Sequence, residues 1–212
     1  MKILVLGEHN ENEIQQATLC VVDAAKKLGG EIDIMLTTNA SDKVVNQAST
    51  IDSVSKVLHF SNERFQNIVG EDVAECALSI SDDYDFFLTS SSTTGKNILP
   101  RIAAKLDIQQ ISEIIEIIDP KTFKKPIYAG SCIATVSTSQ KKNALTIRTT
   151  SFDKAELGSG SAVVETKNCP NFSSRRTDFV KNELTVSDRP ELTAADIICL
   201  LYTSDAADDI GR

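Results

Sequence analysis

Short apolar segments alternate with amphipathic ones through the first half of the 212-residue chain. The run KILVL (2–6) is continuously apolar, which is typical of a strand buried on both faces of a sheet. A helix-spaced stretch follows from Ile14 to Leu28, and Gly29-Gly30 ends it. Further strands are expected at 31–37, 56–60 and 84–90, and further helices at 42–49, 69–81 and within 89–107. This order predicts βαβ units, and therefore a parallel, Rossmann-like α/β sheet with helices on its faces.

Beyond about residue 108 the pattern is rich in β-type segments. They are separated by short turns and lie at 111–119, 126–139, 144–152 and 161–167. Lys141-Lys142-Asn143 resembles a hairpin tip, so we expect antiparallel strands added to the parallel sheet or continuing from it. Residues 168–193 are polar with little periodicity, which is typical of a linker or an extended arm.

Composition and charge narrow the class of protein. The net charge of −8 argues against a nucleic-acid-binding protein, which needs a basic surface. No apolar run approaches the ~20 residues of a membrane span, so no membrane insertion is expected. The N-terminus starts directly with a strand and resembles neither a signal peptide nor an Arg-rich transit peptide. We expect a bacterial cytoplasmic protein, or one of the mitochondrial matrix if the chain is a processed eukaryotic one.

The five cysteines form no CxxC pair. They are Cys20, Cys76, Cys132, Cys169 and Cys199. This scatter predicts reduced thiols in the core rather than disulfides or a zinc site. Cys20 and Cys76 lie on apolar helical faces, where a cysteine acts as a small buried hydrophobic residue.

The segment TSSSTTGKN (89–97) has the general appearance of a phosphate-binding loop. The Walker pattern G-x-x-x-x-G-K-[ST] is not met, because Ser90 replaces its first glycine and Asn97 its metal-binding hydroxyl. The segment still follows a strand and opens a helix, where backbone N–H groups can hold an anion. Helix capping by a hydroxyl is the favoured interpretation, and ligand binding is the alternative. Pro100 is expected in or just past the first helical turn, with Lys96 and Arg101 as surface charges or partner contacts.

The remaining chemical candidates have simple structural interpretations. His9 is expected to be structural or solvated, His59 to be a hydrogen-bonded core residue, and the acidic turn to be solvated rather than a metal site. That turn contains Asp82, Asp83 and Asp85. Arg175-Arg176 either meet an acidic partner or keep a linker soluble. We therefore assign no residue to catalysis, to cofactor binding or to a metal.

Several motifs together resemble the electron-transfer flavoprotein alpha subunit family. TTGKNILPRIAAKLD (93–107) is similar to that family's T-T-x-G-K-x-x-x-P-R-x-A-A-x-L pattern, with the spacing before the glycine shorter by one residue. Five further segments of the chain are similar to the corresponding stretches of that family. They are ILVLGEHN, AAKKLGGEIDI, PIYAGSCIATV, TIRTTSF and ELTVSDRPELT. The resemblance is collinear over about residues 2–195, and it implies an α/β domain of the adenine nucleotide alpha hydrolase-like type.

The resemblance also implies a function. Such an alpha subunit forms a heterodimer with a beta subunit and is an electron carrier rather than an enzyme. Its FAD accepts electrons from acyl-CoA dehydrogenases of fatty acid β-oxidation and passes them to a quinone oxidoreductase. AMP, where present, belongs to the beta subunit, so the 89–107 segment is expected to serve as a scaffold. A strand-borne Arg148 either reaches toward the flavin domain or lies at a sheet edge. A stand-alone adenine-nucleotide-binding module is the alternative.

The resemblance divides the chain into three parts. Residues 1–167 are expected to form the N-terminal α/β domain and 168–195 an arm toward an FAD domain. Residues 196–212 depart from the family pattern and are expected to be an aberrant tail, an artefact of truncation. The family's FAD-binding domain is then missing, and the chain is expected to expose a surface meant for the beta subunit.

Overall fold

The computed structural model describes residues 1–39, 42–177, 179–181, 183 and 197. The chain forms two units, Met1–Phe179 and Val180–Arg212, and the fold below is that of the first. Apart from Ile197, the expected tail 196–212 falls outside the described residues. Within the described part of the chain, no helix is both long and apolar enough to cross a membrane.

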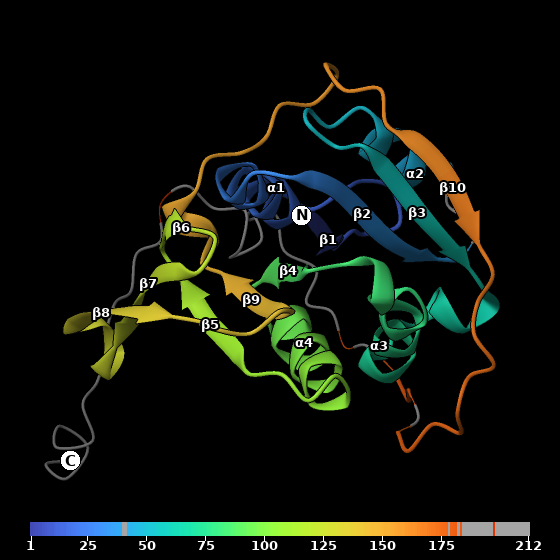
Figure 1. Ribbon diagram of the computed structural model, residues 1–212. Coiled ribbons are helices and arrows are strands. Elements are labelled where there is room, and N and C mark those ends of the chain that lie inside the picture. Colours follow the sequence, from blue (N-terminus) through green and yellow to red (C-terminus); the bar gives the residue numbers. More distant parts are fainter. Residues whose placement is uncertain (40–41, 178, 182, 184–196, 198–212) are drawn as a thin grey trace, which may run out of the picture. The chain divides into compact units, whose positions relative to one another are not determined.

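In the part of the chain that the structure describes, seven parallel strands form the main sheet, in the order β10-β3-β2-β1-β4-β9-β5 (Figure 1). The strands are β1 (Lys2–Leu6), β2 (Glu31–Thr38), β3 (Lys56–Ser61), β4 (Phe86–Ser90), β5 (Gln110–Ile114), β9 (Asn143–Ile147) and β10 (Val163–Lys167). The helices are α1 (Gln16–Leu28), α2 (Asp42–Ser49), α3 (Gly70–Ser79) and α4 (Thr93–Lys105). The predicted Rossmann-like α/β fold is confirmed.

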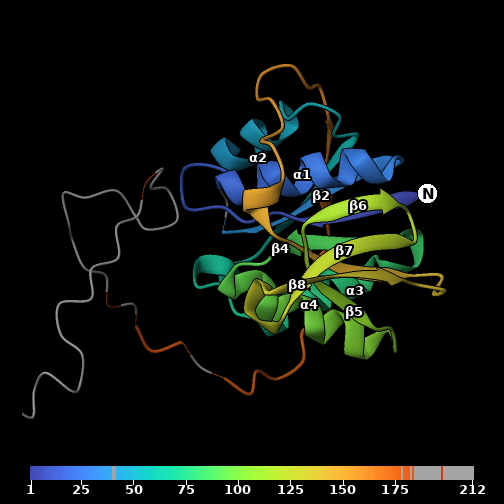
Figure 2. The same cartoon turned by 90° about the vertical axis from the view of Figure 1, so that its left-hand side faces the viewer.

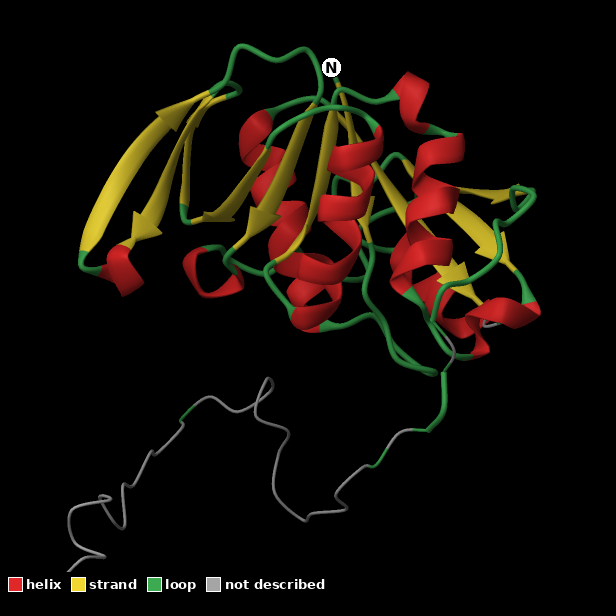
Figure 3. Ribbon diagram, turned by 90° about the horizontal axis from the view of Figure 1, so that it is seen from below, coloured by secondary structure: helices red, strands yellow, loops and turns green. Residues whose placement is uncertain are grey.

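The five central strands of this sheet, β3, β2, β1, β4 and β9, are buried on both faces. Ile3 and Val5 of β1 join the core that α1 and α2 cover, whereas Leu4 and Leu6 join the core that α3 and α4 cover. Successive residues of a strand point to opposite faces, so a strand covered on both sides needs an unbroken apolar run. Seen from below, helices lie across the strands (Figure 3).

A smaller antiparallel sheet, β6-β7-β8, lies beside the main one (Figure 2). Its strands are β6 (Glu116–Asp119), β7 (Thr122–Ile127) and β8 (Cys132–Ser137). Phe123 is fully buried in the same core as α1, and Val136, its partner in the register, packs against that core. The far ends of β7 and β8 are not covered in this way, and large apolar side chains are exposed there. They are Ile127, Tyr128 and Ile133.

The expected antiparallel direction is wrong for the last two strands of the main sheet. β9 is parallel to β4 and β5, and β10 is parallel to β3. A parallel pair needs a crossover of a dozen or more residues, usually a helix. Between β5 and β9 the three strands of the small sheet supply this crossover. Residues 141–143 therefore join strands of two different sheets and are not a hairpin tip.

Several element boundaries also differ from the expectation. The segment 111–119 is not one strand. β5 has an irregularity at Glu113, where φ is 60°, and ends at Ile114; the chain then enters the other sheet at Glu116. Helix α1 begins at Gln16 because Ile14 is held in a β-bridge with His9. Residues 149–151 form a short 3₁₀ turn rather than a continuation of β9.

The cysteine prediction is confirmed only in part. Cys20 and Cys76 are buried in the two cores. Cys132 is exposed on β8, and Cys169 is partly buried. The expectation of a core thiol is wrong for Cys132, because the end of the small sheet extends beyond the core. Cys199 falls outside the described residues.

Lys142 does not form a hairpin tip; its side chain binds backbone carbonyl groups instead. Its ammonium group donates to the carbonyl oxygens of Ser81 and Tyr84 at 2.6 and 2.8 Å, and to that of Asp82 at 3.3 Å. These carbonyls belong to the turn between α3 and β4, so the side chain ties that turn to the start of β9. Hydrogen bonds from a charged donor are among the stronger ones in proteins.

We expect Lys142→Met to lower the free energy of unfolding by about 1–3 kcal/mol, because it removes a charged donor from three carbonyls. Urea-induced unfolding measures this change. Lys141→Met is the matched control, because Lys141 is exposed one residue earlier and should change stability little. Equal losses in the two variants would show that the carbonyl contacts are not stabilising.

Asp33 is a buried carboxyl group on β2. It is only 2% exposed, and its Oδ2 accepts a 2.6 Å hydrogen bond from the Tyr84 hydroxyl. Its Oδ1 has no hydrogen-bond partner among the described residues. Burial raises the pKa of Asp33, and the hydrogen bond from Tyr84 partly opposes that rise. The folded protein therefore holds a proton on this carboxyl more tightly than the unfolded chain does.

This pKa shift predicts a pH-dependent cost to stability. Above the folded-state pKa the buried charge destabilises the fold, and the cost disappears as pH falls toward the ordinary aspartate pKa of about 3.9. The free energy of unfolding of Asp33→Asn should therefore exceed that of wild type most at pH 7 and progressively less at lower pH. Urea unfolding across this pH range measures the difference. The exposed Asp82→Asn is the control, and a difference between Asp33→Asn and wild type that is independent of pH would contradict the prediction.

Candidate functional site

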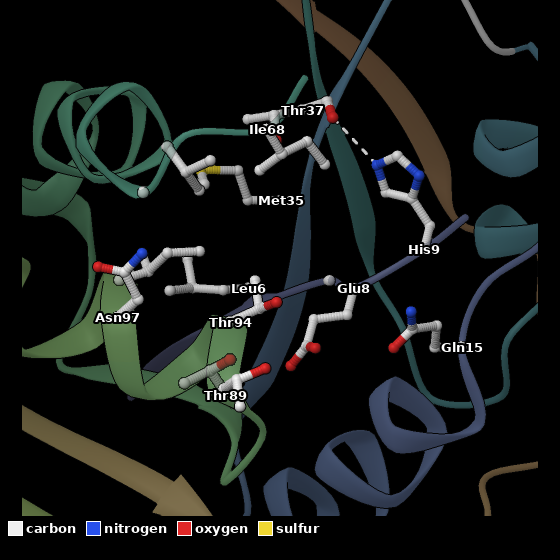
Figure 4. Close-up of a pocket in the computed structure, with 15 residues that line it drawn as sticks. Leu6, Glu8, His9, Gln15, Met35, Thr37, Ile68, Thr89, Thr94 and Asn97 are labelled. Atoms are coloured by element: carbon white, nitrogen blue, oxygen red, sulfur yellow. Dashed lines mark hydrogen bonds between the residues drawn. The ribbon is translucent and has the colours of Figure 1, made fainter. Parts of the chain in front are cut away.

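A cavity of about 300 Å³ opens at the carboxyl edge of the main sheet, where β1, β2 and β4 end (Figure 4). Apolar side chains from the strands, from the segment just before α3, and from α3 and α4 line one part of it, and hydroxyl, amide and carboxylate groups line the rest. The apolar residues are Leu6, Met35, Ile68, Val73 and Ile98, and the polar ones include Glu8, Thr37, Thr93, Thr94 and Asn97. Ligands of open α/β sheets commonly bind at this edge. The cavity is therefore the candidate functional site.

Helix α4 begins beside this cavity and is capped by Ser92. The Oγ of Ser92 accepts a 2.9 Å hydrogen bond from the backbone N–H of Gly95, which confirms the capping interpretation of the 89–97 segment. The Ser92 hydroxyl donates in turn to the Glu8 carboxylate at 2.8 Å, and the Ser90 hydroxyl also donates to it. A helix N-terminus attracts negative charge. Here the chain's own Glu8 supplies it.

Gly95 is needed for close packing rather than for phosphate. A Cβ at this position would lie 2.1 Å from the carbonyl oxygen of Ser90 and 2.8 Å from the Oγ1 of Thr89. The first turn of α4 therefore rests directly on the end of β4. Thr89 is 1% exposed, and its Oγ1 has no hydrogen-bond partner in the described part of the chain.

The two basic residues of this segment, Lys96 and Arg101, interact with other side chains of the chain and do not line the cavity. Lys96 pairs with Glu113 of β5 and is not among the residues that line the cavity. The Arg101 guanidinium donates to the Oδ1 of Asn97 at 3.2 Å and lies 3.7 Å from the Glu71 carboxylate. Both behave as surface charges, as expected. The segment therefore lacks the first glycine, the phosphate-binding lysine and the metal-binding hydroxyl of a Walker loop.

The expected position of Pro100 is wrong. Because α4 begins at Thr93, Pro100 lies well beyond the first turn, where a proline removes a hydrogen bond to the carbonyl of Lys96. Pro100 is exposed, so its ring lies on the solvent side of α4 rather than in the core.

The two histidines are held by hydrogen bonds within the chain. His59 is buried, its Nε2 lies 2.8 Å from the Thr38 hydroxyl, and burial lowers its pKa. This confirms the core role predicted for it. The Nε2 of His9 lies 3.0 Å from the Thr37 carbonyl oxygen and the Nδ1 2.8 Å from that of Asn10, so His9 fixes the turn at the cavity mouth (Figure 4). Among the described residues, no cluster of three or more His, Cys, Asp or Glu is arranged to hold a metal ion.

Arg175 meets an acidic partner within its own chain. Its guanidinium pairs with Asp72 of α3, whose side chain is 3% exposed, and Arg64 pairs with the same carboxylate at 3.0 Å. Phe172 packs edge-on against Phe65, with ring centroids 5.9 Å apart. Residues 168–176, which we call the clasp segment, therefore lie against α3 although they have no regular secondary structure. Of the two alternatives for Arg175, only the acidic partner fits.

The acidic turn and Arg148 are at the surface. Asp82, Asp83 and Asp85 are exposed, as expected for a solvated turn, and Asp85 accepts a hydrogen bond from the backbone N–H of Lys2 at 2.8 Å. Arg148 is exposed directly after β9 rather than within a strand, because β9 ends at Ile147. This turn and Arg148 are not among the residues that line the cavity.

Sequence reasoning missed Glu8 and Asp72, the two acidic residues that organise these contacts. The sequence did contain a signal for Glu8. Glu8 comes just after β1 and Ser90 ends β4. Because these two parallel strands are adjacent, both residues lie at the same edge of the sheet. Asp72 looked like an ordinary acidic residue in the first turn of a helix. Its burial depends on the clasp segment about a hundred residues later in the chain.

The comparisons with known proteins identify the family. The model of the electron transfer flavoprotein domain matches residues 3–170. A Pseudomonas aeruginosa protein named electron transfer flavoprotein subunit alpha is 44% identical over 93% of this chain and 64% of its own length. A Paracoccus denitrificans protein of the same name is 34% identical over 92% of this chain and 63% of its own. A Caenorhabditis elegans protein, named a probable mitochondrial alpha subunit, is 33% identical over 92% of this chain and 59% of its own.

The chain thus spans less than two thirds of the length of these relatives. The match includes both the parallel sheet and the small antiparallel sheet, since it extends from β1 to beyond β10. The chain belongs to the electron transfer flavoprotein alpha-subunit family.

Proposed function

We propose that this chain is the N-terminal scaffold of an electron-transfer flavoprotein alpha subunit. In this proposal it is an electron-carrier subunit rather than an enzyme, and it pairs with a beta subunit. The complete heterodimer carries electrons through FAD from acyl-CoA dehydrogenases to a quinone oxidoreductase. The observation that carries the proposal is the family match over residues 3–170, supported by relatives that are named alpha subunits.

The described residues do not fit FAD. The cavity of about 300 Å³ is at the small end of the ~300–1,000 Å³ range of small-molecule sites, and a flavin dinucleotide is a large ligand. The Glu8 carboxylate occupies the start of α4 and would repel a pyrophosphate there. We therefore infer that the flavin is held by residues outside the described part of the chain, and that no residue named here binds it.

The exposed end of β7 and β8 is the surface that we assign to the beta subunit. Ile133 is 53% exposed, Tyr128 is 80% exposed, and Ile127, which precedes Tyr128 in the chain, is 37% exposed. Large apolar side chains gathered on a surface mark protein interaction sites more often than isolated ones do. A tyrosine adds a hydroxyl group at the rim of such a contact.

We expect this chain to co-purify with the beta subunit of its own organism, and the double variant Tyr128→Ser/Ile133→Ser to bind it at least tenfold more weakly. Full burial of a large apolar side chain contributes about 1.5–3 kcal/mol, and tenfold in affinity corresponds to about 1.4 kcal/mol. Titration calorimetry or analytical ultracentrifugation measures the difference.

Ile118→Ser is the matched control, because Ile118 is 50% exposed on β6, outside this hairpin end. Unchanged affinity in the double variant would overturn the assigned surface. Failure of the unaltered chain to bind any beta subunit would instead count against the proposed function.

A stand-alone adenine-nucleotide-binding module remains the second candidate, because a cavity does lie at the ligand-binding edge of the sheet. The position of Glu8 opposes it, since phosphate groups would meet a carboxylate at the start of α4. The polar part of the cavity offers hydroxyl and amide groups, but the nearby Lys96 pairs with Glu113.

We expect no binding of AMP or ATP at micromolar concentrations when either is titrated into the isolated chain. Glu8→Gln removes the competing charge and should strengthen any binding of inorganic phosphate or AMP, whereas the exposed control Glu11→Gln should not. Calorimetry measures both. Micromolar affinity for AMP or ATP in the unaltered chain would favour the nucleotide-binding module.

A further inference from the structure

Two cysteine thiols meet where the clasp segment crosses α3. Cys76 lies on α3 and is 0% exposed, whereas Cys169 lies in the clasp segment and is partly buried. Burial raises the pKa of the Cys76 thiol, and its side-chain contact with Cys169 raises it further. Cys169 also packs against the core cluster that contains Cys76, and its own thiol lies 3.6 Å from the Ser61 carbonyl oxygen.

We propose that Cys76 and Cys169 form an intramolecular disulfide when the protein meets hydrogen peroxide, and that this bond locks the clasp segment onto α3. The pair is then a site of reversible oxidation, a property separate from the proposed scaffold function.

Contacts on the C-terminal side of Cys169 hold the clasp segment, and with it Cys169, against α3 before any bond forms. Phe172 packs on Phe65, and Arg175 pairs with the buried Asp72 one turn before Cys76 on α3. These contacts already order the clasp segment. The attack of one sulfur on the other is therefore effectively unimolecular, which favours the intramolecular product over reaction with another thiol.

The reaction balances with peroxide as the oxidant. The Cys169 thiolate attacks one oxygen of hydrogen peroxide, an S–O bond forms, the O–O bond breaks, and the departing hydroxide takes up a proton to give water. The Cys76 sulfur then attacks the resulting sulfenic acid, the S–S bond forms and the S–O bond breaks. The leaving hydroxide takes the Cys76 proton as a second water. Two thiols are oxidised, and one peroxide is reduced to two waters.

Accessibility makes Cys169 the sulfur that reacts with peroxide first. Cys76 is fully buried, so peroxide meets Cys169 before it meets Cys76. Burial raises the pKa of both thiols, while hydrogen bonds from Cys76 and the Asn62 side chain oppose the rise at Cys169. The pair therefore stays reduced without an oxidant and reacts slowly with one.

The other described cysteines are placed to act differently. Cys20 lies in the core on the opposite face of the sheet, where it shares no cluster with Cys76. Cys132 is exposed at the end of the small sheet and is open to bonding between molecules.

The test uses the full chain carrying Cys132→Ser and Cys199→Ser, treated with hydrogen peroxide. We expect the intact mass to fall by two hydrogen atoms, and a non-reducing digest to contain one peptide that joins Cys76 to Cys169. Dithiothreitol should reverse both changes. Tryptic cleavage after Arg175 and Arg176 should become several-fold slower in the oxidised protein, because the clasp segment can no longer leave α3.

Single substitutions in the chain that carries Cys132→Ser and Cys199→Ser separate the role of Cys169 from that of Cys76. In Cys76→Ser, Cys169 should stop at a sulfenic acid that dimedone captures, and in Cys169→Ser, Cys76 should remain a thiol. Cys76→Ala replaces Cys76→Ser if the buried hydroxyl prevents folding, as judged by circular dichroism. Over-oxidation of Cys169 while Cys76 stays free, or a linked peptide that contains Cys20, would overturn the proposal. Unchanged tryptic cleavage would overturn the locking of the clasp segment.

Discussion

Burial of the five central parallel strands on both faces is the constraint on which the rest of this fold depends. Each of these strands has to be covered above and below, so the chain must cross from one strand to the next over a face of the sheet. Helices make several of these crossings. The crossing from β5 to β9 is made by the small antiparallel sheet, which adds Phe123 to the core on the α1 side. The same sheet carries an exposed apolar end, so one insertion both completes the core and offers a surface.

The carboxyl edge of the sheet has the architecture of a ligand site without the charge of a phosphate site. In folds of this type the start of a helix at that edge attracts an anion. Glu8 occupies the place of that anion and ties the end of β1 to the start of α4 through Ser90 and Ser92. A segment that resembles a phosphate-binding loop therefore stabilises the domain itself. This structural role of Glu8 and Ser92 supports the scaffold function that we propose.

The clasp segment shows how a polar sequence can be ordered without regular structure. Asp72 would be a costly buried charge if it were alone, because desolvation of an unpaired carboxylate is strongly unfavourable. Two guanidinium groups, of Arg64 and Arg175, compensate that charge, and Phe172 covers the apolar surface beside it. The contacts extend the domain past β10, and they bring Cys169 against the core cluster that contains Cys76.

The sequence by itself determined the Rossmann-like α/β class, the buried strands and the family. Apolar runs, helix periodicity and the collinear motifs are local properties, and they are readable in segments such as KILVL and TTGKNILPRIAAKLD. The capping role of Ser92 and the core role of His59 were predictable for the same reason. The domain boundaries at 167 and 195 stay predictions.

Only the tertiary structure decided the direction of β9 and β10, the partner of Arg175 and the carboxylate at the start of α4. Each depends on residues that are far apart in the chain. A strand has the same side-chain pattern whether its neighbour runs parallel or antiparallel, so periodicity cannot supply its direction. Glu8 and Ser90, like Asp72 and Arg175, become neighbours only when the order of the strands and the path of the clasp segment are known.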